Sequence, residues 1–372
     1  MYFAFSQEQE EFRDSLRRLL TKRAPMTRVR AVAAADDGYD AETWRLLCRD
    51  MGLPGLHIGE EYGGGGFSYL ETAVALQELG RALTPVPMAA TAFACEAVLR
   101  LGTPEQRRRL LPPLARGERL GAFAVAGRRD LEPEAATVRA EAAPGAGAVL
   151  HGTRDIVLHG DPADLLIVPA VAEAGGPVRL YAVEAGDPRV TAERQESLDL
   201  TRPVARVAFD GAPAEPLGGA EAPAGALDRV IDTARTLLAF EMLGTAERCL
   251  EMAVDYAKVR HQFNRPIGSF QAIKHRCADM AVELDMAYGA AMYAAMLAGD
   301  DTADIGEPAL IAKAQAAEAL RLCAGGSIQV HGGIGFTWEH DAHLYFRRAK
   351  AVEALFGSIH EHRALLADRI AI

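Results

Sequence analysis

The sequence predicts a mainly α-helical protein with a central β domain, because the spacing of its apolar residues changes twice along 372 residues. Apolar residues recur at helical spacing in residues 1–118 and again in residues 223–372. Between them, residues 119–222 carry short apolar runs separated by Gly, Pro and Asp. We therefore expect an N-terminal helical domain (1–118), a small antiparallel β domain (119–222) and a C-terminal four-helix bundle (223–372).

The N-terminal region contains two complete helix-start signals. Ser6 is followed three residues later by Gln9, and Thr103 is followed by Pro104 and then Gln106. A hydroxyl cap with Gln at the third helical position predicts a capping box, and proline suits a first helical turn. Helical patterns also cover residues 42–51 and 70–82, whereas the glycine-rich stretch 60–66 predicts a flexible turn.

The middle region has the pattern of a small antiparallel β domain. Its apolar runs include residues 120–125, 165–171, 178–183 and 204–209. Turns are expected at residues 144–147 and 175–177, where Pro and Gly cluster.

The C-terminal region predicts long bundle helices. No proline interrupts the helical spacing from Leu227 to Pro266, so one very long amphipathic helix is expected there. A second helix should run from Gln271 to Ala298, and a third over residues 307–325. The glycine-rich stretch that begins at Gln329 is then expected to be a loop between two helices.

Composition excludes several classes of protein. A net charge of −11 with pI near 5.5 leaves no surplus of cations for nucleic acid. Five scattered cysteines without a Cys-x-x-Cys pair indicate reduced, packed thiols. The opening residues lack a secretory pattern and no apolar run has membrane length, so we expect a cytoplasmic protein without a membrane partner.

Three motifs carry a resemblance to a known family. They are Arg260-His261-Gln262-Phe263, Gln329-Val330-His331-Gly332-Gly333-Ile334-Gly335, and Phe356-Gly357-Ser358. With the order of the domains, they resemble the flavin-dependent acyl-CoA dehydrogenase family over the whole chain. The Glu-Glu-x-Gly-Gly loop at residues 60–66 is also similar to that family.

The resemblance implies FAD as cofactor and one set of residues that contact its ADP half across a subunit interface. These residues are Arg260, Gln262, Phe263, Phe270, Gln271, Gln329, Val330, His331, Gly332 and Gly333. Arginine supplies a fixed charge for a pyrophosphate, and glycines let the backbone approach a ligand closely. The alternative is structural: Arg260 and Gln262 would cap a solvated helix end and Phe263 would pack in a core.

The half of the family site that holds the flavin ring is not matched. The family carries a Thr/Ser-Glu-Pro loop and a Trp-Ile-Thr/Ser turn, where this chain has residues 124–130 and 154–160. Neither segment contains the hydroxyl donors or the tryptophan that the resemblance would require.

The resemblance also implies a catalytic carboxylate that this chain lacks, so no catalytic residue is assigned. Abstraction of an acyl thioester's α-proton needs a base, and Phe356 stands where most of the family has its Glu. The other family position is occupied by Ala234. Glu241 lies two turns further, roughly 10 Å along the helix axis, and is expected to be a structural or interface carboxylate.

A metal site is not expected. His340 with His343, and His360 with His362, have close spacing, but no third ligand accompanies either pair at a recognised distance.

These features favour a non-catalytic subunit of an FAD-dependent acyl-CoA dehydrogenase. Its expected partner is a second family subunit in an α2β2 heterotetramer, which would desaturate an acyl-CoA thioester and pass electrons to an electron-transfer flavoprotein or similar acceptor. Relatives of this kind act in bacterial steroid and CoA-thioester degradation. The alternatives are a self-sufficient homo-oligomer with a relocated base such as Glu241, and a flavin-free scaffold of the same fold.

Overall fold

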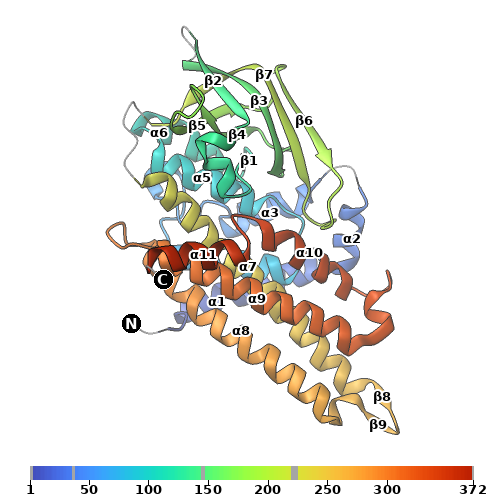
Figure 1. The fold of residues 1–372 in the computed structure, drawn as a ribbon. Helices are drawn as coiled ribbons and strands as arrows, with labels where there is room; N and C mark the ends of the chain where they lie inside the picture. The colour runs from blue at the N-terminus through green and yellow to red at the C-terminus, as the bar shows by residue number, and fades with distance from the viewer. Residues whose placement is uncertain (1–2, 36–37, 144–146, 219–224, 371–372) are drawn as a thin grey trace.

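The computed structural model describes residues 3–35, 38–143, 147–218 and 225–370, and it has the three predicted regions in the predicted order (Figure 1). Two helical regions are joined through a β domain that lies at one end of the molecule (Figure 1). Helical regions on both sides of a central β domain are the arrangement that the sequence predicts. None of the helices in the described ranges is both long and apolar enough to cross a membrane.

The N-terminal helices begin where the capping signals predict. Their bounds are α1 Gln7–Arg23, α2 Met26–Ala33, α3 Ala41–Met51, the 3-10 helix η1 Glu60–Tyr62, α4 Tyr69–Arg81, α5 Met88–Leu101 and α6 Pro104–Ala115. Ser6 and Gln9 exchange both bonds of a capping box, at 3.3 and 2.9 Å. Thr103 and Gln106 do the same at the start of α6, which confirms both predictions.

The glycine-rich stretch at residues 60–66 is a turn, as the sequence predicts, and backbone hydrogen bonds tie it to the preceding segment. The Gly65 N–H donates to Gly55 O (2.9 Å), and the Gly66 N–H donates to Ile58 O (2.8 Å). A Cβ at Gly64 would lie 2.2 Å from Ile58 O. Glycine is therefore needed here for close packing of the backbone.

The β domain is a mixed sheet, which corrects the expectation of an antiparallel one. Its strands are β1 Gly121–Phe123, β2 Val138–Ala143, β3 Gly147–Leu158, β4 Leu165–Val171, β5 Val178–Glu184, β6 Val190–Gln195 and β7 Val204–Pro216, with 3-10 turns η2 Arg128–Leu131 and η3 Pro133–Ala135. β1 and β2 each pair with β4 in parallel, and the remaining pairs are antiparallel. Parallel pairing needs a long crossover, and the β2–β3 excursion between β1 and β4 supplies it.

The pairings close the sheet on itself, since β4 contacts both β2 and β5 while β3 and β7 complete the ring. Strands β2, β3 and β6 alternate with polar residues and so lack the apolar runs used to find the others. The turn predicted at residues 144–147 lies outside the described residues except for Gly147, which begins β3. Gly175 (φ +76°) lies in the other predicted turn.

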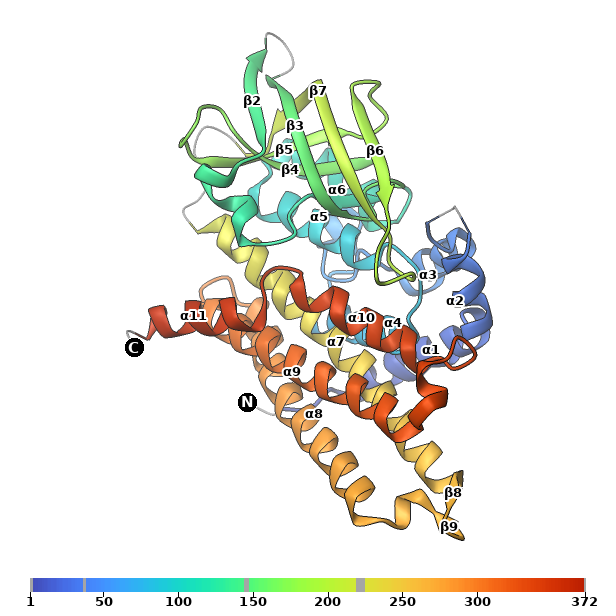
Figure 2. The same ribbon diagram turned by 45° about the vertical axis from the view of Figure 1, so that its right-hand side comes forward.

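The C-terminal region consists of long helices (Figure 2). They are α7 Ala226–Val259, the hairpin β8 His261–Gln262 and β9 Arg265–Pro266, η4 Ile267–Ser269, α8 Gln271–Ala298, α9 Gly306–His331, η5 Gly332–Phe336, α10 Ala342–Ala354 and α11 Ile359–Arg369. α7 packs on α4 and α5 on one side and on α8 and α9 on the other. All five cysteines are free thiols.

Helix α9 is longer than predicted, so the first residues of the glycine motif are helical and do not lie in a loop. The sequence placed its end at residue 325, but Gly325 and Gly326 remain helical. A Cβ at Gly326 would lie 2.6 Å from the sulfur of Met280, so the glycine permits close packing on α8, and that packing maintains the helix. Gln329 and His331 consequently lie on the last turn of α9, and only η5 forms the turn.

Two glycines bring α4 and α7 into backbone contact. A Cβ at Gly80 would lie 2.2 Å from Glu241 O, and one at Gly244 would lie 1.8 Å from Gln77 O. The Thr245 hydroxyl donates to Gly80 O (3.1 Å) across the same crossing. This contact holds the middle of α7 directly against α4 in the core.

We predict that Gly244→Ala lowers the free energy of unfolding by about 1–3 kcal/mol, because the added methyl meets backbone that cannot move aside. The matched control is Gly289→Ala on the exposed face of α8, where a Cβ meets nothing within 4 Å. That change should raise the free energy of unfolding by roughly 0.5–1 kcal/mol through helix propensity. Urea denaturation of both variants measures the difference, and equal effects would contradict the close crossing.

Candidate functional site

The first predicted element forms a preorganised hairpin at the end of α7. The Arg260 N–H ends the helix by donating to Tyr256 O (2.9 Å). Phe263 and Asn264 then make a two-residue turn with φ of +51° and +62°, and β8 pairs with β9 around them. Positive φ at both central residues is the geometry of a type I′ hairpin, which is costly for a bulky residue.

The tip of this hairpin faces away from the chain's own core. Phe263 is 87 % exposed, and Arg260 and Gln262 are exposed as well. The Phe263 ring meets the Phe270 ring edge-on at 6.0 Å, and the Arg265 guanidinium lies 4.0 Å over Phe270. Arg260 and Gln262 lie at a solvated helix end, as the structural alternative expects, but Phe263 does not pack in the core of this chain.

The second predicted element lies at the C-terminal end of α9. Val330 and His331 are buried, whereas Gln329, Gly332 and Gly333 are exposed. Gly332 has φ +65°, and a Cβ at Gly332 or Gly333 would meet nothing within 4 Å. Packing within the chain therefore does not demand the second glycine, and the open space above it can receive another group.

Ring stacking joins the two elements. The His331 ring lies between Tyr256 (4.5 Å) and His340 (4.3 Å), and Tyr256 is the residue that accepts from the Arg260 N–H. Burial lowers the pKa of His331, which favours a neutral ring in this stack. The structure thus brings the two predicted cofactor elements to one end of the bundle, far from the β domain (Figure 2).

The two segments predicted opposite a flavin ring are linked to each other by an ion pair. Arg154 is buried, pairs with Asp130 and donates from Nε to Ala124 O (3.1 Å). Asp130 in turn accepts from the Ala126 N–H (2.6 Å) and the Gly127 N–H (3.1 Å). These contacts use the Arg154 guanidinium and the Asp130 carboxylate within the chain, whereas neither ring nitrogen of His159 has a partner among the described residues.

Phe356 fills the position where the resemblance places a catalytic carboxylate. It is 3 % exposed, and its ring meets Phe93 edge-on at 5.2 Å and lies 6.4 Å from Phe123. Its N–H donates to Ala126 O (2.6 Å), and its carbonyl accepts from Arg235 Nε (3.1 Å). Ala234, the other position, is buried in α7. Neither side chain can accept a proton.

Glu241 belongs to a buried ion cluster that sequence reasoning missed. The cluster consists of Asp199, Thr201, Arg202, Glu241 and Arg348, all buried. Arg348 donates to Glu241 Oε1 (2.8 Å) and to Thr201 Oγ1 (2.6 Å), and it also pairs with Asp199. Arg202 forms a second ion pair with Glu241. The available signal was the pair Arg347-Arg348 directly after the apolar run Leu344-Tyr345-Phe346.

Burial and the charges of the ion cluster shift the pKa values of Asp199 and His159. Burial opposes ionisation of Asp199, but Arg348 and Arg202 outweigh it and lower the pKa of that carboxyl. Burial, with the same two guanidinium groups, lowers the pKa of His159 to about 3. The cavity that these residues enclose measures only about 10 Å³, room for roughly one water.

Comparison with known proteins assigns the chain to a family. Family models match at residues 6–118 (acyl-CoA dehydrogenase, N-terminal domain) and 225–371 (acyl-CoA dehydrogenase, C-terminal domain). The chain belongs to the acyl-CoA dehydrogenase family. FAD is the cofactor of this family, and its members are flavoprotein oxidoreductases.

Three relatives are similar to this chain over nearly its whole length. The acyl-CoA dehydrogenase IpdE2 of Mycobacterium tuberculosis is 38 % identical over 355 residues, which is 95 % of each chain. A solved variant of the steroid acyl-CoA dehydrogenase Tcur3481–Tcur3483 is 32 % identical, covers 98 % of each chain and has a TM-score of 0.88. The ChsE4–ChsE5 complex from Mycobacterium tuberculosis is 29 % identical, covers 100 % of this chain and 99 % of that one, and has a TM-score of 0.89.

The histidine pairs do not form a metal centre in the structure. Within the described ranges, no three His, Cys, Asp or Glu side chains are placed to hold an ion. His340 stacks on His331, and His343 packs edge-on against Trp338 (4.7 Å). His362 Nε2 is hydrogen-bonded to Phe356 O (3.0 Å) and supports the phenylalanine's backbone.

We predict that acidification from pH 6.5 to pH 3 destabilises the protein in part through His159. Its folded pKa of about 3 lies below the usual value, so only the unfolded state binds that proton in this window. The free energy of unfolding should fall by up to about 1.4 kcal/mol per pH unit for this residue. His159→Asn, which tolerates the positive φ, should flatten that slope in urea titrations at several pH values. The exposed control His360→Asn should keep the wild-type slope, and an unchanged slope in His159→Asn would contradict the assignment.

Proposed function

We propose that this chain is the non-catalytic subunit of a heteromeric FAD-dependent acyl-CoA dehydrogenase. In this proposal it contributes the residues that contact ADP to a flavin site whose ring pocket and catalytic base belong to a partner subunit of the same family. The observation that carries the proposal is the contrast between the two ends of the site. The predicted ADP end is open and exposed, and the predicted ring end is filled by the chain's own side chains.

The filled end supports the absence of a ring site in this chain. His159 belongs to one of the segments predicted opposite the ring, and it borders the ion cluster of Arg348 and Glu241. A cavity of about 10 Å³ cannot receive a fused three-ring system. Opening it would separate buried charges, and breaking such a pair costs roughly 3–5 kcal/mol.

The open end supports a role in holding ADP. Arg260 and Gln262 present donors to solvent, and the backbone beside Gly332 and Gly333 can approach a ligand without side-chain obstruction. A guanidinium suits a pyrophosphate because it forms charge-assisted hydrogen bonds. Phe263 offers a flat apolar face at the hairpin tip. With no ring site of its own nearby, this end is suited to a nucleotide whose ring lies in the neighbouring subunit.

The base positions support a division of labour. Bound FAD would supply the hydride acceptor for acyl-CoA oxidation, so a protein side chain must remove the α-proton. Phe356 and Ala234 cannot do so. Here Phe356 packs between Phe93 and Phe123 and closes the position, while Arg235 holds its carbonyl.

The substrate class that we propose is a steroid-derived acyl-CoA thioester, with a flavoprotein as electron acceptor and a cytoplasmic location. The support is the similarity to the steroid acyl-CoA dehydrogenase Tcur3481–Tcur3483 and to the ChsE4–ChsE5 complex. The heteromeric composition of those two proteins is also the reason for proposing an α2β2 assembly.

One observation favours a second candidate, a self-sufficient enzyme with Glu241 as its base. Glu241 Oε2 is buried and has no hydrogen-bond partner among the described residues. Against it, Oε1 of the same carboxylate is bound by Arg348 and Arg202. Two guanidinium groups already contact Oε1, so the carboxylate serves as their buried counter-charge.

The first test is the flavin content of the complex with the partner subunit. Co-purified with that subunit, the assembly should contain about half as much FAD as protomers, measured by flavin absorbance against protein concentration. Arg260→Ala should weaken FAD retention roughly 10- to 150-fold, the equivalent of about 1.5–3 kcal/mol for a charge-assisted contact. Arg139→Ala, an exposed arginine on β2, is the matched control. One FAD per protomer would overturn the proposal.

The second test decides between the two enzymatic candidates. Glu241→Gln should destabilise the complex, since Arg348 and Arg202 lose a buried counter-charge. Turnover per bound flavin should nevertheless stay close to the wild-type value, measured as acyl-CoA-dependent reduction of an artificial acceptor. Loss of a true general base would instead lower kcat roughly 10²- to 10⁴-fold. Such a loss with flavin still bound would make this chain the catalytic one.

A further inference from the structure

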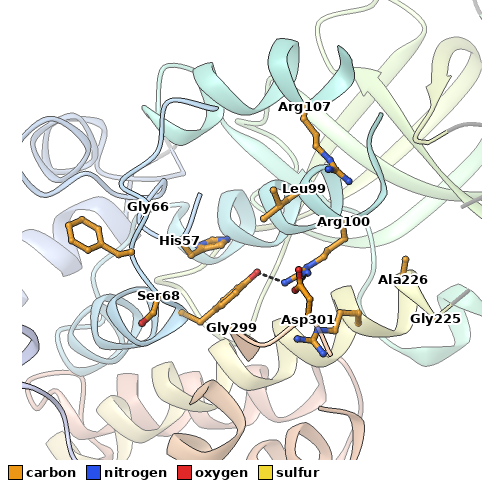
Figure 3. Close-up of a pocket in the computed structure, with 13 residues that line it drawn as sticks. His57, Gly66, Ser68, Leu99, Arg100, Arg107, Gly225, Ala226, Gly299 and Asp301 are labelled. Carbon is orange, nitrogen blue, oxygen red and sulfur yellow. Dashed lines mark hydrogen bonds and ion pairs between the residues drawn. The ribbon is translucent and has the colours of Figure 1, made fainter. Parts of the chain in front are cut away.

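A second, larger cavity lies away from both ends of the proposed flavin site. It measures about 810 Å³ and opens where the N-terminal helices meet the start of α7 and the turn between α8 and α9 (Figure 3). Its walls include Phe67, Tyr69, Leu99, Arg100, Arg107 and Arg229. None of these residues belongs to the hairpin, the glycine motif or the ion cluster.

A buried polar cluster forms one wall of this cavity. Glu96 is fully buried and accepts from the Tyr69 hydroxyl (2.7 Å) and from Arg100 Nε (2.8 Å). Arg100 Nη2 donates to the Tyr69 oxygen (3.0 Å), and Asp301 pairs with Arg100 from the rim. Figure 3 shows Arg100 and Asp301 together on this wall. The charge of Arg100 is therefore balanced by two carboxylates.

Three buried nitrogen atoms of the lining residues have no partner within the described ranges. They are His57 Nε2, Arg107 Nε and Arg229 Nε. His57 is 7 % exposed, stacks on Tyr69 at 4.8 Å, and is bonded only through Nδ1 to Thr72 Oγ1 (3.1 Å). Its Nε2 lies 3.7 Å from Glu96 Oε2, beyond hydrogen-bonding distance. A buried polar atom without a partner is costly, and all three lie on residues that line this cavity, which makes the cavity a candidate ligand site.

The guanidinium groups of Arg107 and Arg229 favour a negatively charged ligand. Arg107 forms no ion pair with any described residue, and Arg229 donates to main-chain carbonyls at the end of α8, including Ala298 O (3.1 Å) and Asp300 O (2.8 Å). Neither guanidinium is thus hydrogen-bonded to a carboxylate of the described residues. An anion would complete them, while exposed Phe67 (57 %) and half-buried Leu99 and Ala226 offer apolar contact to an attached body.

We propose that this cavity binds a small organic acid. Its carboxylate would be held by Arg107 and its apolar body would lie against Phe67, Leu99 and Ala226. Arg100 is fixed by Glu96 and supports the polar wall. The site is independent of FAD and of acyl-CoA oxidation, so it stands or falls separately from the proposed function.

The test uses octanoate and octan-1-ol as probes in calorimetric titrations of the full-length chain. Octanoate should bind, and octanol should bind at least tenfold more weakly because it lacks the charge. Arg107→Gln should weaken octanoate binding at least tenfold. The matched control is Arg108→Gln, a neighbouring exposed arginine that pairs with Glu105 (3.6 Å) outside the cavity, and it should bind as the wild type does.

A filling variant separates this cavity from other apolar surfaces. Leu99→Trp should abolish octanoate binding because the larger side chain fills the cavity. If that variant does not fold, Ala226→Met should abolish octanoate binding for the same reason. Octanoate that fails to bind, or that binds equally to wild type and Arg107→Gln, would overturn the proposal. Tighter binding of inorganic phosphate than of octanoate would also overturn it, since a bare anion site would need no apolar wall.

Discussion

The buried guanidinium of Arg348 is the interaction on which the arrangement of the domains depends. A charge in the interior is tolerated only when it is paired and hydrogen-bonded, and here its partners come from separate parts of the chain. Asp199 and Thr201 belong to the connection between β6 and β7, and Glu241 belongs to α7. Arg348 itself lies on α10, so one side chain ties the β domain to two bundle helices. The glycine contact between α4 and α7 adds the N-terminal domain, because Gly80 packs against the backbone of Glu241.

The same cluster explains why the two halves of the family site differ in this chain. Where the resemblance places the flavin ring, the interior holds buried ion pairs, and Phe356 closes the neighbouring position. At the other end, Arg260, Phe263 and the Gly332 turn face solvent, and few of their polar or apolar groups find partners within the chain. A protein that bound the whole cofactor by itself would need an open pocket with free hydrogen-bonding groups at the flavin ring. The contrast is therefore a property of packing and charge and does not rest on a missing motif alone.

The features that depend on neighbouring residues in the sequence were predicted correctly. The capping boxes at Ser6 and Thr103, the length of α7 and the order of the three regions follow from neighbouring residues, and all are confirmed. The parallel pairing of β1 with β4 could not be read in this way, because it depends on a long crossover through β2 and β3. Gly325 and Gly326 predicted a helix end, but packing on α8 prevailed over propensity. The residues predicted to contact ADP gather at one end of the bundle, yet the Arg348 cluster was missed because its members are distant in sequence.

The turn at Phe263 and Asn264 has a consequence for how any neighbour is recognised. Both residues already hold left-handed backbone angles in the single chain, so the hairpin tip has its turn geometry without a neighbour. The entropy of ordering it is lost before association begins, and docking need not supply that free energy again. Partner proteins are then distinguished by shape complementarity. A surface with a pocket that fits the hairpin tip can bind, whereas a flat surface clashes with the tip.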